Sequence, residues 1–291
     1  MLTLGTSPPG GGFTPYGAAF AATVNELEPS VEIQPVNTKG STENIPLLER
    51  GKLSLGLVGG EPAFEALAGV GRAPASLRII APMYSSAGMF VVRGDSPYAS
   101  IGDLKGQPVV FGVRGSGLVV LARYAIDGMG LDMDRDFQAI YLDRSDEGVA
   151  MVQDGRAAAL WGGGIGWPGF VNMAKSPGGA RFVVPNEAET ARILSKHGFL
   201  KRLTVPAGIY AGQQAPIHSV GTWSVVLSRA DLDENVAHAI ARAVHKGESA
   251  MAKRATSAQE TRAANTLVAA SRREHIHPGV LRCLRDAGLS T

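Results

Sequence analysis

Three glycine-rich loops carry the residue types with the most chemistry to offer. They read GTSPPGGG at 5–12, GVRGSG at 112–117 and WGGGIGWPG at 161–169, and each follows an apolar run and precedes a helix-like stretch. Glycine lets a backbone approach a ligand closely and adopt positive φ. Helix amino termini add unpaired N–H groups and the positive end of the helix dipole. The sequence therefore predicts a polar pocket for an anionic or acceptor-rich ligand.

Arg114 is the sharpest single candidate in these loops. Its guanidinium beside the glycine and serine amides would clamp a carboxylate or phosphate, and a salt bridge between lobes is the alternative. Ser41 and Glu43 begin the helix-like GSTEN stretch, where they either cap the helix and add charge to its first turn or contact the ligand. Asn44 follows them, and we expect its polar side chain to contact the ligand. The candidate ligand-binding residues are Thr6, Ser7, Gly10, Gly11, Gly12, Phe13, Ser41, Glu43, Asn44, Gly59, Arg114, Gly115, Ser116, Gly117, Trp161, Gly162 and Trp223.

The remaining candidates have a plain structural alternative. Thr6 and Ser7 either cap a turn or contact the ligand, because hydroxyl groups serve both purposes. Phe13, Trp161 and Trp223 are either core aromatics or apolar lids on the ligand. The glycines act through backbone geometry or only form turns.

The motifs of three enzyme classes are absent from these loops. A phosphate-binding P-loop needs a lysine where Gly11 stands, and a dinucleotide fingerprint needs a small residue where Val120 stands. A nucleophile elbow needs glycine two positions before Ser116, where Arg114 stands. The six histidines are scattered and show no metal-ligand spacing. We therefore expect a binding protein with no catalytic centre, no metal and no cofactor.

Composition narrows the partners. The 291 residues hold 28 Lys and Arg against 26 acidic residues, a net charge of +2, which argues against a nucleic-acid partner or an anionic membrane surface. The single cysteine, Cys283, excludes an internal disulfide. No apolar run approaches the roughly 18 to 20 residues that cross a bilayer, and no leader-like segment precedes Leu2. A small neutral or singly charged solute fits best.

Alternating apolar runs and helix-like stretches predict an α/β fold with mainly parallel sheets and helices on both faces. In such sheets ligands bind at the carboxyl ends of the strands, where the loops above lie. The expected strands are 31–37, 53–60, 78–84, 89–93, 108–113, 158–164 and 220–228, and the expected helices are 15–28, 41–51, 117–130, 146–156 and most of 231–288. We expect two lobes, 1–91 plus 214–291 and 92–213, with chain crossings near 91–93 and 212–215.

Several long motifs resemble one family. GTSPPGGGFTPYGAAFA, GSTENIPLLERGKLSLGLVGG, VVRGDSPYASIGDLKGQPVVFGVRGSG and the closing IHPGVLRCLRDAGL are similar to segments of the TAXI-type solute-binding proteins of tripartite ATP-independent periplasmic (TRAP) transporters. The resemblance spans nearly the whole chain. The proline pair Pro8 and Pro9 and the VGGE stretch depart from the family pattern.

The resemblance implies a type II periplasmic binding protein, a monomer of two α/β lobes that closes about its hinge on a solute and delivers it to a TRAP membrane permease. The solute it implies is a glutamate-like or dicarboxylate acid. It also implies a periplasmic location, so we expect the native chain to carry a leader in place of Met1. The alternatives are an enzyme or a cytoplasmic ligand sensor on the same scaffold.

Overall fold

The computed structural model describes residues 1–289, which form two compact units. Unit 1 consists of Met1–Pro8, Gly12–Tyr84 and the segment from Trp223 onward, and unit 2 of Pro9–Gly11 and Ser85–Thr222. Each unit has strands flanked by helices, which confirms the expected α/β class with two lobes. The crossings expected near 91–93 and 212–215 lie within unit 2 by this division, and the lobe limits stay a prediction.

The sheet of unit 1 is built on three neighbouring parallel strands. β1 (Leu2–Gly5) pairs in parallel with β2 (Ile33–Val36) and β3 (Leu55–Val58). The long strand β11 (Ile217–Arg229) pairs antiparallel with β3, and β4 (Leu77–Ala87) also pairs with β11. The carboxyl ends of β1, β2 and β3 therefore lie at one edge.

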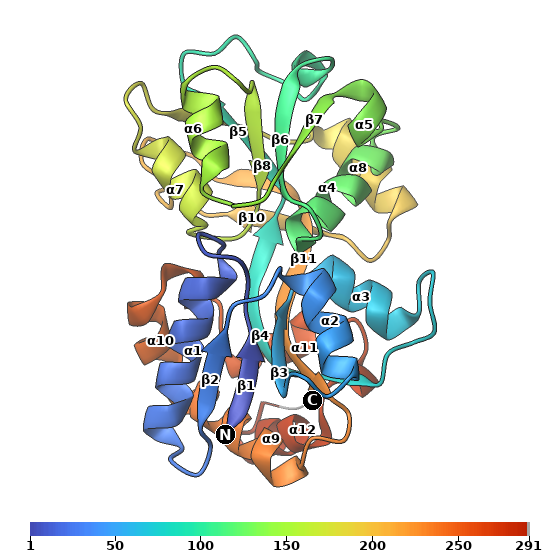
Figure 1. Ribbon diagram of the computed structural model, residues 1–291, viewed down its shortest axis with the longest axis vertical. Coiled ribbons are helices and arrows are strands. Elements are labelled where there is room, and N and C mark those ends of the chain that lie inside the picture. The colour runs from blue at the N-terminus through green and yellow to red at the C-terminus, as the bar shows by residue number, and fades with distance from the viewer. Residues whose placement is uncertain (290–291) are drawn as a thin grey trace. The chain divides into compact units, whose positions relative to one another are not determined.

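Helices cover both faces of this sheet because alternate strand residues point to opposite sides. Leu55 and Leu57 pack into one buried cluster, whereas Val58 packs into the other. Figure 1 shows α1 on one side of β1 to β4 and α2 and α3 on the other. The helices of this unit are α1 (Phe13–Leu27), α2 (Ser41–Glu49), α3 (Gly60–Ala68), α9 (Glu234–Lys246), α10 (Glu248–Arg254), α11 (Thr266–Ala269) and α12 (Pro278–Asp286), with 3₁₀ turns at Thr256–Ala258, Ala263–Asn265 and Arg273–His275.

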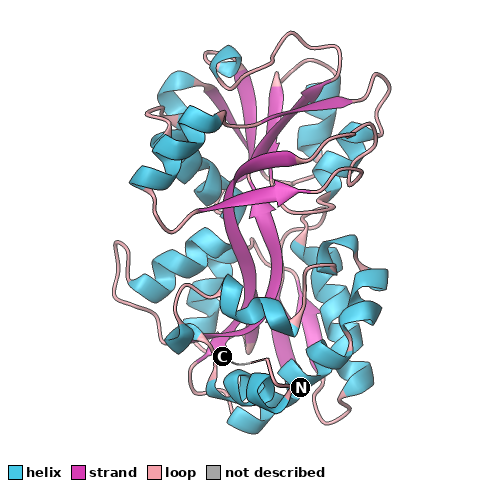
Figure 2. Cartoon of the chain, turned by 180° about the vertical axis from the view of Figure 1, so that it is seen from behind, coloured by secondary structure: helices cyan, strands magenta, loops and turns pink. Residues whose placement is uncertain are grey.

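Unit 2 repeats this plan with a five-stranded sheet in the order β7-β6-β8-β5-β9. Val109 and Phe111 face one buried cluster and Val110 faces the other. In Figure 2 the magenta strands run between cyan helices. The elements are β5 (Met89–Arg93), β6 (Pro108–Val113), β7 (Gln138–Leu142), β8 (Ala159–Gly162), β9 (Ala180–Val183), β10 (Lys201–Val205), α4 (Gly117–Gly128), α5 (Met133–Asp136), α6 (Glu147–Gln153), α7 (Pro168–Ala174), α8 (Glu187–Lys196) and a 3₁₀ turn at Gly102–Leu104.

Both sheets combine parallel and antiparallel strand pairs. β6 pairs in parallel with β7 and β8, but β5 pairs antiparallel with both β8 and β9. β10 and β11 form a further antiparallel pair. Each sheet is therefore mixed, because the strands around the two changes of unit run against the parallel strands.

His277 caps the last helix of unit 1 from a buried position. Its Nδ1 accepts a hydrogen bond from the Gly279 N–H at 3.2 Å, which leaves Nε2 to donate to the Leu232 carbonyl at 3.0 Å. Burial lowers the pKa of His277 and Arg78 adds to the lowering, against the Leu232 bond and nearby Glu234. The neutral imidazole is thus the form that the fold requires.

This cap predicts a loss of stability in mild acid. The unfolded chain binds the His277 proton more readily than the folded chain, so the free energy of unfolding should fall as the pH drops below about 6.5. His277→Asn, which can cap α12 without titrating, should lose less stability over the same range. Urea unfolding at about pH 7.5 and about pH 5.5 measures both slopes. Equal slopes in the two proteins would contradict this role of His277.

Candidate functional site

The carboxyl ends of the unit 1 strands are joined by one side chain, Asn44 of α2. Its Nδ2 donates to the carbonyls of Gly5, Thr6 and Leu57 at 3.3, 2.9 and 2.8 Å, and the residue is fully buried. A buried carbonyl needs a hydrogen-bond donor. The Asn44 amide therefore holds β1 to β3, while its Oδ1 has no hydrogen-bond partner in the described chain, and a ligand contact of Asn44 stays a prediction.

Thr6 and Ser7 are also engaged within unit 1. The Thr6 hydroxyl donates to the Val36 carbonyl at 3.0 Å and so ties the end of β1 to the end of β2. The Ser7 hydroxyl lies 3.2 Å from that of Thr14 in the first turn of α1. Both hydroxyls fix the course of the 5–12 loop, which is the structural alternative that the sequence left open.

Ser41 and Glu43, the other polar candidates of unit 1, accept hydrogen bonds from backbone N–H groups of neighbouring loops. Ser41, the first residue of α2, accepts a hydrogen bond from the Gly59 N–H at 2.9 Å and is fully buried. Glu43 accepts from the Lys39 N–H at 2.5 Å, so its carboxylate folds back onto the turn before the helix. These bonds hold the end of β3 beside the start of α2.

At two of the predicted glycines, the backbone conformation or a close neighbour explains why no side chain is present. Gly10 adopts φ +81° at the tip of the first loop, which by contact belongs to unit 2, and a Cβ there would lie 3.3 Å from that of Asp146. A Cβ on Gly162 would come within 2.2 Å of the Trp167 ring. Gly162 is therefore required for packing against Trp167. Gly11 is buried, and Gly12 is the N-cap residue of α1.

Arg114 contacts an aromatic ring, whereas several other arginines of its unit pair with an acid. Within residues 1–289 it has no carboxylate partner, and its guanidinium carbon lies 4.2 Å from the centre of the Tyr141 ring. By contrast, Arg93, Arg144 and Arg156 each form an ion pair with an aspartate two residues away. Arg114 is exposed. Its N–H donors therefore remain available to an anion.

The start of α4 lies directly after Arg114 in the chain. Gly115 adopts φ +83°, which turns the chain into the helix, and Ser116 is the N-cap residue without a side-chain cap bond. The Ser116 hydroxyl is buried and has no hydrogen-bond partner in the described chain. The first N–H groups of a helix also lack intrahelical acceptors, and Gly117 begins this one. Arg114 and Ser116, two positions apart in the sequence, thus both have side-chain donors without a hydrogen-bond acceptor in the described chain.

The three aromatic candidates separate into two kinds. Trp161 is 1 % exposed, donates from Nε1 to the Leu118 carbonyl at 2.8 Å and packs edge-on against Phe90. It is a core residue of unit 2, which corrects the lid interpretation. Phe13 and Trp223 are only partly buried, and Phe13 lies 6.5 Å from the Tyr84 ring. These two remain candidates for the apolar part of a ligand site.

Sequence reasoning missed three residues near these strand ends. Tyr141 stands at the end of β7 and supports Arg114; burial raises its pKa, and a hydrogen bond to Asp134 adds to the rise. Tyr84 ends the unit 1 part of β4, and burial raises its pKa as well. Glu61, in the first turn of α3, is 1 % exposed. The sequence pattern that could have indicated these residues is their position at the carboxyl end of a strand or at the start of a helix.

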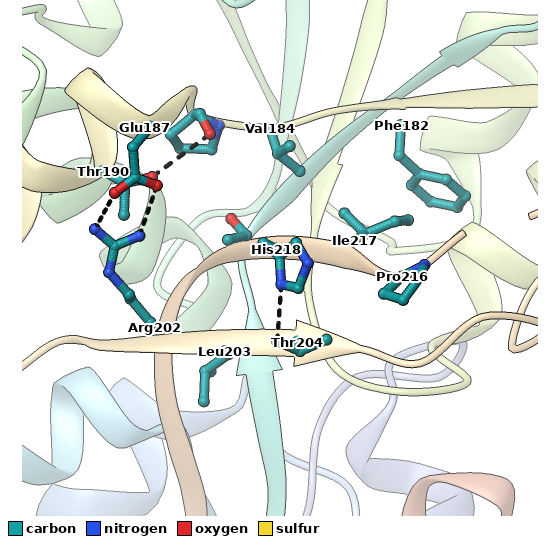
Figure 3. A pocket seen from close by; sticks show the side chains of 12 residues that line it. Phe182, Val184, Glu187, Thr190, Arg202, Leu203, Thr204, Pro216, Ile217 and His218 are labelled. Atoms are coloured by element: carbon teal, nitrogen blue, oxygen red, sulfur yellow. Dashed lines mark hydrogen bonds and ion pairs between the residues drawn. The ribbon is translucent and has the colours of Figure 1, made fainter.

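A cavity of about 570 Å³ in unit 2 lies elsewhere (Figure 3). Its charged groups pair with each other: Arg202 donates to Glu187 at 2.8 Å, and the Thr204 hydroxyl lies 3.0 Å from His218 Nδ1. None of the residues predicted for the site lines it. Because its polar groups are already partnered, this cavity offers less to an anion than the Arg114 loop does.

Over residues 1–289, no group of three or more His, Cys, Asp or Glu side chains is arranged to hold a metal ion. In the same residues no helix has the length and apolar character to cross a membrane.

A model of the NMT1-like family matches residues 4–288. Solved structures of similar fold include a Bordetella bronchiseptica protein, with a TM-score of 0.61 and 13% identity over 99% of this chain and 98% of that one. The periplasmic aliphatic sulphonate binding protein SsuA of Escherichia coli has a TM-score of 0.51 and 19% identity, over 89% and 73%. The amino acid ABC transporter substrate-binding protein AbpA of Streptococcus pneumoniae, bound to L-arginine, has 0.53 and 13%, over 88% and 93%. At such identities the likeness shows the fold alone.

The Asn44 contacts predict an unusual order of stability among variants. Asn44→Ala removes the donors for buried carbonyls and should cost about 1–3 kcal/mol for each one left unsatisfied. Asn44→Asp should cost more, because a carboxylate cannot donate and would face the same carbonyl oxygens. Urea unfolding measures both, with Asn172→Asp on an exposed position of α7 as the control. Equal stability of Asn44→Asp and wild type would contradict the assignment.

Proposed function

The chain belongs to the NMT1-like family, and we propose that it is an extracytoplasmic solute-binding protein for a small carboxylate-bearing solute. The similar fold of solved substrate-binding proteins supports a binding role. In this proposal the protein captures the solute reversibly as a monomer and hands it to a membrane permease. Binding without turnover is the expected behaviour.

The observation that carries the proposal is the unpaired Arg114 beside the start of α4. Its guanidinium has five donors in a planar fork that matches a carboxylate. Ser116 adds a hydroxyl without a partner, and the helix start adds N–H groups and a positive dipole end. An excess of fixed donors favours an anionic solute. We propose that Phe13 and Trp223 contact its apolar body.

We propose a more specific class of solute than anions in general. SsuA is described as binding aliphatic sulphonates and AbpA is bound to L-arginine, so proteins of this fold take solutes that carry an acid group. The TAXI-like sequence motifs favour glutamate-like and dicarboxylate solutes. We therefore propose an organic acid or amino acid with at least one carboxylate. Sulphonates are the matched comparison, because they present a tetrahedral acid group.

The membrane partner proposed here is a TRAP permease. This rests on the motifs that resemble TAXI-type proteins, whereas solved structures of similar fold include substrate-binding proteins of ABC transporters. The two classes differ in their energy source, since TRAP transport is independent of ATP. An extracytoplasmic location fits either class, and we propose the periplasm.

Arg114→Ala should weaken the binding of a carboxylate solute strongly. Loss of a charge-assisted hydrogen bond costs about 1.5–3 kcal/mol, which is roughly a 10- to 150-fold rise in Kd. A thermal-shift screen with L-glutamate, succinate, L-arginine and an alkanesulphonate selects the solute, and calorimetric titration of both proteins gives the Kd. Arg156→Ala is the control, because it removes an exposed charge that is already paired with Asp154.

Two results would contradict the proposal. Equal affinity of wild type and Arg114→Ala for the selected carboxylate would remove the anion assignment. Consumption of the solute by the protein, followed by mass spectrometry, would replace binding by catalysis.

The choice of permease predicts transport without ATP. Uptake of labelled solute into membrane vesicles that carry the permease should depend on the added binding protein and persist when ATP is depleted. It should stop when an ionophore removes the ion gradient. Uptake that requires ATP would instead identify an ABC transporter and leave the binding role intact.

A further inference from the structure

We infer that Tyr141, anchored by Asp134, is a positioning residue that holds the Arg114 guanidinium for the carboxylate of the solute. The inference rests on the proposed function for its solute, but the contact on which it depends is a property of the free protein. It adds two residues, on β7 and α5, that neither the family match nor the sequence motifs indicated.

The register of the sheet explains why these side chains meet. β6 and β7 are parallel, and Gly112 of β6 pairs with Tyr141 of β7 after a register shift between Val110 and Gly112. Arg114 follows two residues later, just beyond the end of β6. Its guanidinium carbon therefore lies over the Tyr141 ring, 4.2 Å from its centre.

The ring is itself held in place. The Tyr141 hydroxyl donates to Asp134 Oδ1 at 3.0 Å. Asp134 lies in the first turn of α5, where its N–H and that of Arg135 donate to the N-cap carboxylate of Asp132 at 3.0 Å. Asp132 caps the first turn of α5, Asp134 in that turn holds the Tyr141 ring, and the ring contacts the Arg114 guanidinium, which has no ion pair in the described chain.

An aromatic ring under the guanidinium leaves the N–H donors of Arg114 available, whereas a carboxylate partner would accept hydrogen bonds from them. A cation–π contact holds the guanidinium over the ring without neutralising its charge, so its N–H groups are not used in an ion pair. A flat, fixed fork loses less conformational freedom when it binds a planar carboxylate. Tyr141 should therefore contribute to affinity only through Arg114.

Arg123 of α4 provides a test of the alternative that charge alone is sufficient. It is exposed, and its positive charge acts on Tyr141 as that of Arg114 does, lowering the tyrosine pKa slightly against the dominant effect of burial. If a general positive potential were enough, Arg123→Ala would weaken binding about as much as Tyr141→Leu. A positioned guanidinium predicts a much larger effect for Tyr141→Leu.

The binding experiment is a double-mutant cycle by calorimetric titration with L-glutamate or, if it binds more tightly, succinate. Tyr141→Leu should raise Kd about three- to tenfold, Tyr141→Phe about twofold because the ring remains, and Arg123→Ala by less than twofold. In the Arg114→Ala background, Tyr141→Leu should change nothing further. Equal effects of Tyr141→Leu in both backgrounds would overturn the inference.

A second measurement needs no solute and separates this inference from the proposed function. In the ¹H–¹⁵N spectrum of the free protein, the Arg114 Nε–H signal, assigned from the Arg114→Lys variant, should move when Tyr141→Leu removes the ring current. Tyr141→Phe should largely keep the wild-type position, and Tyr98→Leu, which removes another ring of unit 2, should not affect it. An unmoved signal in Tyr141→Leu overturns the inference even if carboxylates bind. Failure of all carboxylates to bind, with the expected shift present, would overturn the proposed function instead.

Discussion

The loops at one edge of unit 1 depend on the primary amide of Asn44. Its Nδ2 donates to the carbonyls of Gly5, Thr6 and Leu57 near the ends of β1 and β3. Thr38 Oγ1 also donates to the Thr6 carbonyl, and the Thr6 hydroxyl joins β2 to the same group through Val36. The loops that follow these strands can be glycine-rich because their starting points are held by side chains outside them.

Patterns of apolar residues predicted the buried strands well and the exposed ones poorly. The β5 and β6 segments were expected at 89–93 and 108–113, and they span Met89–Arg93 and Pro108–Val113. Both are apolar runs buried on two faces, a pattern that needs no information from elsewhere in the chain. β10 was missed because Lys201, Arg202 and Thr204 are exposed. Its position is decided by antiparallel pairing with β11, which no local pattern records.

The candidate site shows the same limit at the level of single residues. Thr6, Ser41 and Asn44 hold the backbone, because hydroxyl and amide groups satisfy strand ends as readily as ligands. Arg114 carried a local signal that these residues lack. Arg93, Arg144 and Arg156 each have an aspartate two positions away, whereas Gly112 and Ser116 occupy those positions around Arg114. The local ion pair that these three arginines form is therefore not available to Arg114.

The support under Arg114 has to be a ring if the guanidinium is to stay available. A carboxylate in the place of Tyr141 would also fix the guanidinium, but it would occupy the donor edge and neutralise the charge that attracts an anion. The tyrosine ring lies under the guanidinium carbon and does not neutralise its charge. Asp134 contributes its negative charge one side chain further away, through the Tyr141 hydroxyl, where it fixes the ring without pairing with the arginine. Because Tyr141 lies between Asp134 and Arg114, the guanidinium contacts a ring and has no ion pair in the described chain.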